Sequence, residues 1–124
     1  MSGETMENHR LVMPEHLNHF GFLFGGNLLK WVDEFAWIAA TLEYPGCNLV
    51  TVALDKVEFR ESVREGTILR FLVRKSREGT TSVQYEVTVF RGPESRDTAR
   101  PVFSTHVTLV RVDESGQKTP LPGR

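Results

Sequence analysis

Apolar side chains recur with a helical period in one long segment of the chain, from about Gly25 to Glu43. A spacing of about 3.6 residues places them along a stripe and predicts a helix. The sequence Tyr44-Pro45-Gly46 ends this helix, because proline has neither the amide hydrogen nor the ring geometry that a helix interior requires.

After the helix the period of apolar residues falls to about 2, which is the period of a strand. Upstream of the helix, residues 1–8 are expected to form a loose arm and 15–24 an irregular loop. The predicted strands are Arg10–Met13, Asn48–Phe59, Thr67–Lys75, Thr81–Arg91 and Val102–Val112. Short turns join most of them, which predicts an α+β fold with an antiparallel sheet curled around the helix. We expect one domain over 8–114 and a flexible C-terminal tail over 115–124.

The helix carries two neighbouring acids, Asp33 and Glu34, which point in different directions because successive residues are rotated by about 100°. Glu34 shares an arc with other polar residues and stands four positions after Lys30, so it is interpreted as a solvated surface acid. Asp33 lies among small and apolar neighbours, where a carboxylate loses hydration unless it has a partner or a function. The alternative is an ordinary polar residue at the edge of the helix.

A pair of glycines, Gly25 and Gly26, stands at the start of the helix, two turns before Asp33. Paired glycines let a ligand approach the backbone closely, and free amides at a helix start can hold partial negative charge. Donors for a carbonyl oxygen and an acid that activates water are the groups needed to hydrolyse an activated acyl group. We therefore expect the amides and the carboxylate to flank one bound group.

Charge and composition argue for an ordinary globular protein. The 124 residues carry 15 Lys and Arg against 16 Asp and Glu, a formal net charge of -1. This balance gives no general attraction to nucleic acid or to an anionic membrane. The chain has one cysteine, Cys47, and shows neither a secretory signal nor an apolar run long enough to span a membrane. A soluble cytoplasmic protein is expected.

An ordered set of short motifs extends from Leu11 to Asp113 and resembles one protein family. The motifs are Pro14-Glu15, Asn18-His19, Gly21, Phe24-Gly25-Gly26, Trp31, Asp33-Glu34, Val50–Ala53, Phe59-Arg60, Val63–Gly66, Gly79–Ser82 and Val110–Glu114. Together they resemble hotdog-fold acyl-coenzyme A thioesterases, in the acyl-CoA hydrolase branch of short bacterial enzymes and two-domain cytosolic hydrolases. The resemblance implies a sheet wrapped around the central helix, dimers with a continuous sheet, and often a hexamer built from three dimers. It places the sites at the dimer interface, between the helix start of one subunit and strands of the other.

The resemblance also implies roles for particular residues. Gly25 and Gly26 match the turn whose backbone amide polarises the thioester carbonyl, Asp33 matches the helix acid that acts as base or nucleophile, and Asn18 matches a loop asparagine that holds water or the carbonyl. Phe24 stands where other hotdog thioesterases have histidine, so it can pack but cannot donate a proton. Phe22 stands where some members of the branch have a catalytic Asp or Asn. Either Asp33 with Asn18 carries the reaction, or the activity has been lost.

Six further residues are candidates for contact with substrate. His19 adjoins the predicted site, and Thr51 lies inside a strand, where packing is the simpler interpretation. Arg60 and Arg77 are suited to the phosphates of coenzyme A, because guanidinium pairs well with phosphate oxygens, although a solvated rim is the simpler reading. Thr81 and Ser82 adjoin Gly79 and could contact the same ligand.

The leading hypothesis is hydrolysis of acyl-CoA to free acid and coenzyme A, with no cofactor other than the coenzyme A of the substrate. His16 and His19 lack a third ligand nearby, so no metal site is expected. A non-catalytic module that binds or senses acyl-CoA is the alternative. A hotdog dehydratase is a weaker possibility, since such enzymes usually pair a histidine with an acid and Phe24 stands where that histidine would be.

Overall fold

The structure, a computed structural model, describes residues 5–92 and 100–123. One long helix, α1 (Gly25–Glu43), follows a first strand and a short 3-10 helix, and four long strands come after it. The remaining elements are β1 (Thr5–Leu11), the 3-10 helix η1 (Pro14–His16), β2 (Asn48–Phe59), β3 (Ile68–Glu78), β4 (Ser82–Arg91) and β5 (Phe103–Val112).

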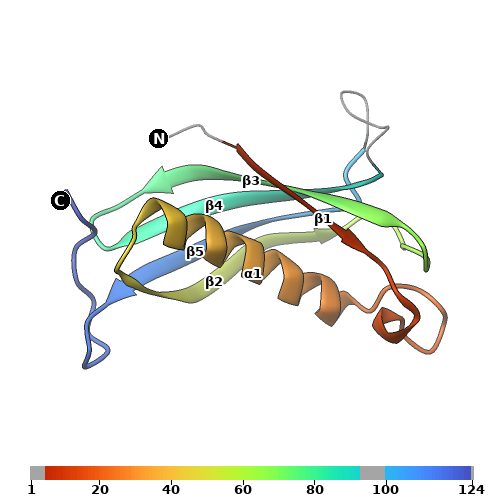
Figure 1. The fold of residues 1–124 in the computed structure, drawn as a ribbon, viewed down its shortest axis with the longest axis horizontal. Helices are drawn as coiled ribbons and strands as arrows, with labels where there is room; N and C mark the ends of the chain where they lie inside the picture. Colours follow the sequence, from red (N-terminus) through yellow and green to blue (C-terminus); the bar gives the residue numbers. More distant parts are fainter. Residues whose placement is uncertain (1–4, 93–99, 124) are drawn as a thin grey trace.

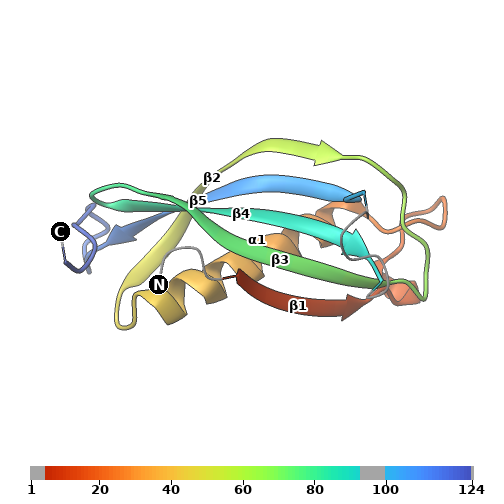
Figure 2. The same ribbon diagram turned by 90° about the horizontal axis from the view of Figure 1, so that it is seen from above.

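The strands form a single five-stranded sheet in the order β1-β3-β4-β5-β2, and every neighbouring pair is antiparallel. Figure 2 shows the strands side by side, with β2 at one edge and β1 at the other. Helix α1 lies across one face of this curved sheet (Figure 1). The predicted α+β architecture, an antiparallel sheet wrapped around one helix, is confirmed.

Helix α1 is fixed by a stripe of buried residues three or four positions apart, which are Leu28, Trp31, Val32, Ala36 and Ala40. These side chains pack against inward-facing residues of the sheet that have no exposed surface, such as Phe71, Phe103 and Leu109. Burial of this apolar surface is the main force that holds the helix on the sheet. Within the described residues, no helix has the length and apolar character that crossing a membrane requires.

The first strand is longer than predicted, and it begins at Thr5 instead of Arg10. The hydrophobic pattern does not reveal its first half, because only one of its three inward-facing residues, Met6, is apolar; the others are Asn8 and Arg10. The strand is held by its pairing with β3, in which Met6 lies opposite Val73. The other predicted strands agree with the structure to within a few residues.

The C-terminal segment does not extend freely from the domain. Lys118 bridges to Val112, the Leu121 N–H donates to the Thr80 carbonyl at 2.9 Å, and the Leu121 side chain is buried. The prediction of a flexible tail over 115–124 is therefore wrong for 115–123, which packs against the sheet without forming a helix or strand.

Two large apolar residues of the helix lie on the surface of the single chain. Trp37 is 44% exposed and Ile38 39% exposed. Trp37 is tied to the neighbouring edge strand by a hydrogen bond from its indole N–H to the Leu49 carbonyl at 3.1 Å. On the same edge strand Val50 and Val52 are also exposed. Helix α1 is thus apolar on a second side, next to β2.

Candidate functional site

The loop between η1 and α1 presents the side-chain amide of Asn18. The Oδ1 atom of Asn18 accepts the backbone N–H groups of Phe20 at 2.9 Å and Phe22 at 3.1 Å. These two bonds fix which end of the side chain is oxygen, since only oxygen accepts. The Nδ2 group has no partner among the described residues, so Asn18 is arranged as a hydrogen-bond donor.

The start of α1 is uncapped. Phe24 occupies the N-cap position, where Ser, Thr, Asp or Asn usually supplies an acceptor, and no side chain caps the helix. The amides of Asn27 and Leu28 donate to the Phe24 carbonyl. In the part of the chain that the structure describes, the amides of Gly25 and Gly26 are left without an acceptor. They are free to hold an oxygen atom of a ligand.

Aromatic rings lie close to both glycines. A Cβ atom at Gly25 would lie 3.2 Å from Cε1 of Phe59, and one at Gly26 would lie 2.7 Å from Cε2 of Phe24. The first contact is tight and the second is closer than real Cβ atoms come. The glycine pair therefore has a packing reason as well as the predicted functional one.

Asn18 and Gly25 line the same cavity, whose volume is about 560 Å³. Most of its lining residues are apolar, and four carry polar side chains. The other lining residues are Phe20, Phe22, Leu23, Leu28, Phe59, Arg60, Glu61, Ser62 and Val63. The structure thus brings together two of the predicted catalytic groups, an amide side chain and a backbone amide, in one hollow.

His16 holds this loop against the helix start. Its carbonyl accepts the Phe24 N–H and the Asn27 side-chain amide, both at 2.9 Å. Its ring packs edge-on against buried Trp31, with the ring centroids 4.8 Å apart, and its Nδ1 accepts the Met13 N–H at 2.9 Å. These contacts fix Asn18 relative to Gly25. In the sequence, His16 stands out only as a candidate metal ligand.

The second half of the candidate site lies further along α1. The half-buried Asp33 carboxylate accepts a hydrogen bond from the Thr51 hydroxyl of β2, with 2.6 Å between Oγ1 and Oδ1. The neighbouring Glu34 is exposed, as predicted, and lies 4.0 Å from Arg10. Thr51 therefore orients Asp33. Residue spacing could not show this, because the two residues belong to different elements.

A single chain does not bring these two halves together. Asp33 comes eight residues after Gly25, so at about 1.5 Å per residue the two are about 12 Å apart along the helix. Asp33 also does not line the cavity that contains Asn18 and Gly25. The expectation that the amides and the acid flank one bound group is not met within one chain.

The remaining predicted contacts are divided between two regions. His19 is exposed beside Phe20, and Arg60 lines the cavity while paired with Glu58. Arg77 instead lines a separate hollow of about 220 Å³ with Asp55, Lys56, Gln84 and His106.

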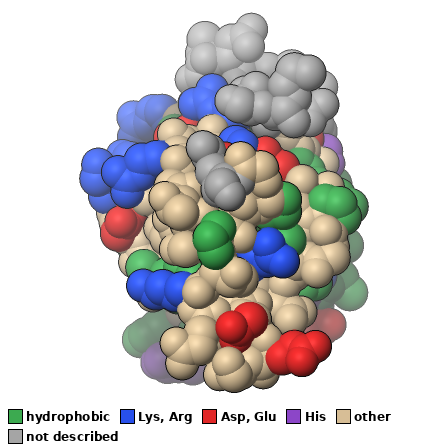
Figure 3. Space-filling model, turned by 90° about the vertical axis from the view of Figure 1, so that its left-hand side faces the viewer, with side chains coloured by type: hydrophobic (Ala, Val, Ile, Leu, Met, Phe, Trp, Pro, Cys, Tyr) green, Lys and Arg blue, Asp and Glu red, His purple; other side chains and the backbone are tan. Residues whose placement is uncertain are grey.

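Thr81 and Ser82 lie at the turn between β3 and β4, so like Arg77 they are not part of the wall of the Asn18 cavity. The turn belongs to the end of the molecule seen in Figure 3, where Lys and Arg side chains stand at separate places with Asp and Glu between them. The structure does not join these residues to the helix start.

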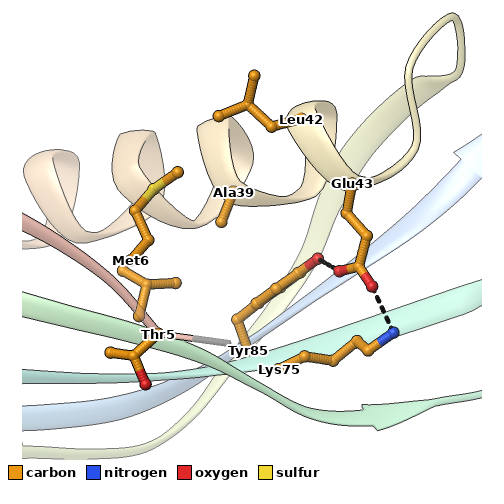
Figure 4. A pocket seen from close by; sticks show the side chains of 8 residues that line it. Thr5, Met6, Ala39, Leu42, Glu43, Lys75 and Tyr85 are labelled. Carbon is orange, nitrogen blue, oxygen red and sulfur yellow. Dashed lines mark hydrogen bonds and ion pairs between the residues drawn. The ribbon is translucent and has the colours of Figure 1, made fainter. Parts of the chain in front are cut away.

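A further cavity, of about 380 Å³, lies at the far end of α1 and contains a charged network that the sequence did not reveal. Lys75 donates to Glu43 at 2.5 Å, and the Tyr85 hydroxyl donates to the same carboxylate at 2.5 Å (Figure 4). Burial and the hydrogen bond to Glu78 raise the pKa of Tyr44 to about 12. Burial alone would lower the pKa of Lys75, but its hydrogen bonds to the two glutamates raise it. The charges pair with one another, so the network ties α1 to β3 and β4.

A family model described as the thioesterase superfamily matches residues 20–97, which is more than half of the chain. The chain belongs to the thioesterase superfamily. The matched residues include the glycine pair and Asp33, whereas Asn18 lies just before them. The predicted family is confirmed.

Three similar proteins show which members of the thioesterase superfamily this chain resembles. It is 30% identical over 117 residues to the human cytosolic acyl coenzyme A thioester hydrolase, covering 90% of this chain but only 30% of the relative's length. It superposes with a TM-score of 0.83 and 28% identity on an acyl-CoA hydrolase from Staphylococcus aureus, solved with butyryl coenzyme A, covering 96% of this chain and 72% of that one. A hexameric hotdog-fold thioesterase from Campylobacter jejuni is 33% identical, with a TM-score of 0.77, and the match covers 92% and 87% of the two chains. The hotdog fold is confirmed.

Proposed function

We propose that this chain is an acyl-CoA thioesterase, which hydrolyses acyl-CoA to a free acid and coenzyme A. The observation that carries the proposal is a set of donors without an acceptor among the described residues: the Asn18 side-chain amide and the Gly25 amide, which line one cavity, and the adjacent Gly26 amide. Donors arranged in this way suit the oxyanion that develops when a thioester carbonyl is attacked. The activities of the human and S. aureus relatives support the same substrate class.

A second copy of the chain supplies the missing acid in this proposal. Strand β2 ends the sheet with a free edge, and Val50 and Val52 on it and Trp37 beside it are exposed. Pairing of two β2 edges would cover this apolar surface and continue the sheet. The second copy then brings its Asp33 toward the Gly25 amide of the first. We further propose assembly of the dimers into a hexamer, as in the C. jejuni protein.

The chemistry follows from these two halves. The Asp33 carboxylate removes a proton from water, and the water oxygen attacks the thioester carbonyl carbon. The amides of Gly25 and Gly26 hold the resulting oxyanion, with Asn18 as a further donor. Collapse of this intermediate breaks the carbon–sulfur bond, and the coenzyme A thiolate takes the proton from Asp33. Direct attack by Asp33, followed by hydrolysis of the anhydride, gives the same products.

Variants of the S. aureus hydrolase support the choice of residues. That enzyme has been solved with one asparagine, one threonine or one aspartate replaced by alanine. The asparagine and aspartate are separated by the same number of residues as Asn18 and Asp33, and the interval from aspartate to threonine differs by one residue from that between Asp33 and Thr51. A cytoplasmic location stays a prediction, which the cytosolic human relative favours.

A thiol-release assay on Asp33→Asn tests the proposal, with Glu34→Gln as the matched control on the adjacent exposed acid. Asp33→Asn should lower kcat by about 10²-fold or more, because general-base catalysis contributes about 10²–10⁴-fold. Binding of coenzyme A, measured by calorimetry, should be retained, and Glu34→Gln should behave like the unmodified protein. Near-normal turnover in Asp33→Asn would remove Asp33 from the mechanism. Tight acyl-CoA binding by the unmodified protein with no thiol release would support the binding module instead.

A further inference from the structure

The cavity beside Gly25 has the properties of a selective acyl site. We infer that it accepts uncharged apolar acyl groups and rejects acyl groups that carry a second carboxylate. This inference rests on the proposed function, because it takes the Gly25 amide as the point at which the carbonyl is held. A volume of about 560 Å³ is within the range of about 300–1,000 Å³ that is usual for small-molecule sites.

The wall nearest the amides is apolar. The Phe59 ring lies 3.2 Å from the position of a Cβ atom on Gly25, so carbons next to a carbonyl held at this amide would contact the ring. Leu28 and Val63, both nearly fully buried, and Phe22 continue this surface. Phe59 itself is 54% exposed, so an acyl chain beside it would remove apolar surface from water.

The charges at the polar side of the cavity pair with other charges of the chain. Arg60 forms an ion pair with Glu58, so a ligand carboxylate would compete with Glu58 for it. Glu61 pairs with Arg91 and lies 3.9 Å from Arg100.

A further basic side chain near this wall packs on an aromatic ring. Arg64 lies over the Phe22 ring, 5.1 Å from its centroid, and is not part of the cavity lining. A second carboxylate on the substrate would therefore lose its hydration against an apolar wall, beside the Glu61 carboxylate, where Arg60, the one cation in the described lining, already has a partner.

Butyryl-CoA and succinyl-CoA provide a matched test, since both acyl groups have four carbons and only succinyl carries a second carboxylate. We expect kcat/KM for succinyl-CoA to be at least 10²-fold lower. We also expect kcat/KM to rise from acetyl- to octanoyl-CoA, by about fourfold per methylene group for as long as the chain stays in contact with the wall. Equal values for butyryl- and succinyl-CoA, or a flat profile with chain length, would overturn the inference while hydrolysis itself stands. If none of these acyl-CoA thioesters is hydrolysed, the proposed function itself is overturned.

Variants of Phe59 test whether the acyl group contacts this ring. Phe59→Ala removes the ring beside the amides, so the octanoyl-to-butyryl ratio of kcat/KM should rise at least threefold as short chains lose their contact. Phe59→Leu keeps an apolar side chain and should give an intermediate ratio, which guards against misfolding of the alanine variant, since Phe59 also packs on Phe103. Leu42→Ala, a similar truncation of an exposed side chain near the other end of α1, should leave the ratio unchanged. An unchanged ratio in both Phe59 variants would place the acyl group elsewhere.

Discussion

Mixed dimers of two inactive variants should recover activity that neither variant has alone. Asn18→Ala removes a donor from one half of the proposed site, and Asp33→Ala removes the acid from the other. Because these halves are about 12 Å apart along one helix, we infer that each complete site takes Asn18 from one subunit and Asp33 from its partner. A dimer containing one subunit of each variant then has one site with both defects and one site with none.

The expected recovery can be calculated from this arrangement. Equal amounts of two freely exchanging subunits give mixed dimers as half of the population, and each has one intact site out of two. About a quarter of all sites, and so about a quarter of the normal kcat per subunit, should therefore return. If Asn18 and Asp33 acted within the same chain, every site in the mixture would carry one defect, and recovery would be zero.

Co-expression with two different affinity tags allows the mixed species to be purified. Thiol release by this species should reach about half of the normal rate, since one of its two sites is intact. Glu34→Gln paired with unmodified protein, carried through the same purification, controls for losses caused by tagging. A purified mixed dimer that is as inactive as its parents would refute a site shared between subunits.

Three further outcomes follow from contacts in the structure. Thr51→Val removes the hydroxyl that orients Asp33 and should lower kcat by about 10–100-fold in the thiol-release assay, whereas Thr51→Ser should keep most of the activity; equal rates in the two variants would contradict this role. Gly26→Ala should be destabilising in urea unfolding because of the Phe24 ring, and in a Phe24→Ala background the same change should instead stabilise the helix by up to about 1 kcal/mol. Leu121→Ala should lower the free energy of unfolding by about 2–3 kcal/mol, a loss that a freely mobile tail would not produce.

The fold was accessible from the sequence where the hydrophobic period was strong. The bounds of α1 and β2 were predicted correctly. A long apolar stripe and a proline turn define α1, and alternating residues define β2. The strand at Thr5–Leu11 was partly missed, because Asn8 and Arg10 face inward where apolar residues are expected. Pairing with β3 stabilises it, and such pairing cannot be read from local sequence.

The candidate site was accessible only in part. Helical geometry distinguished Asp33 from Glu34, and the glycine pair marked the helix start. The hydrogen bond between Thr51 and Asp33 joins residues of different elements, so no spacing rule could reveal it. The separation of Asp33 from the Asn18 cavity was missed for another reason: a shared side of a helix gives the direction of two residues but not the distance between them.

The first turn of α1, which has no side-chain N-cap, limits how stable this protein can become while it stays active. A serine or aspartate in place of Phe24 would supply the absent acceptor and strengthen the helix by about 1 kcal/mol. The same oxygen would compete for the Gly26 amide, one of the two amides that we assign to substrate. Selection for heat resistance alone should therefore favour polar residues at position 24, whereas selection for turnover should keep the ring.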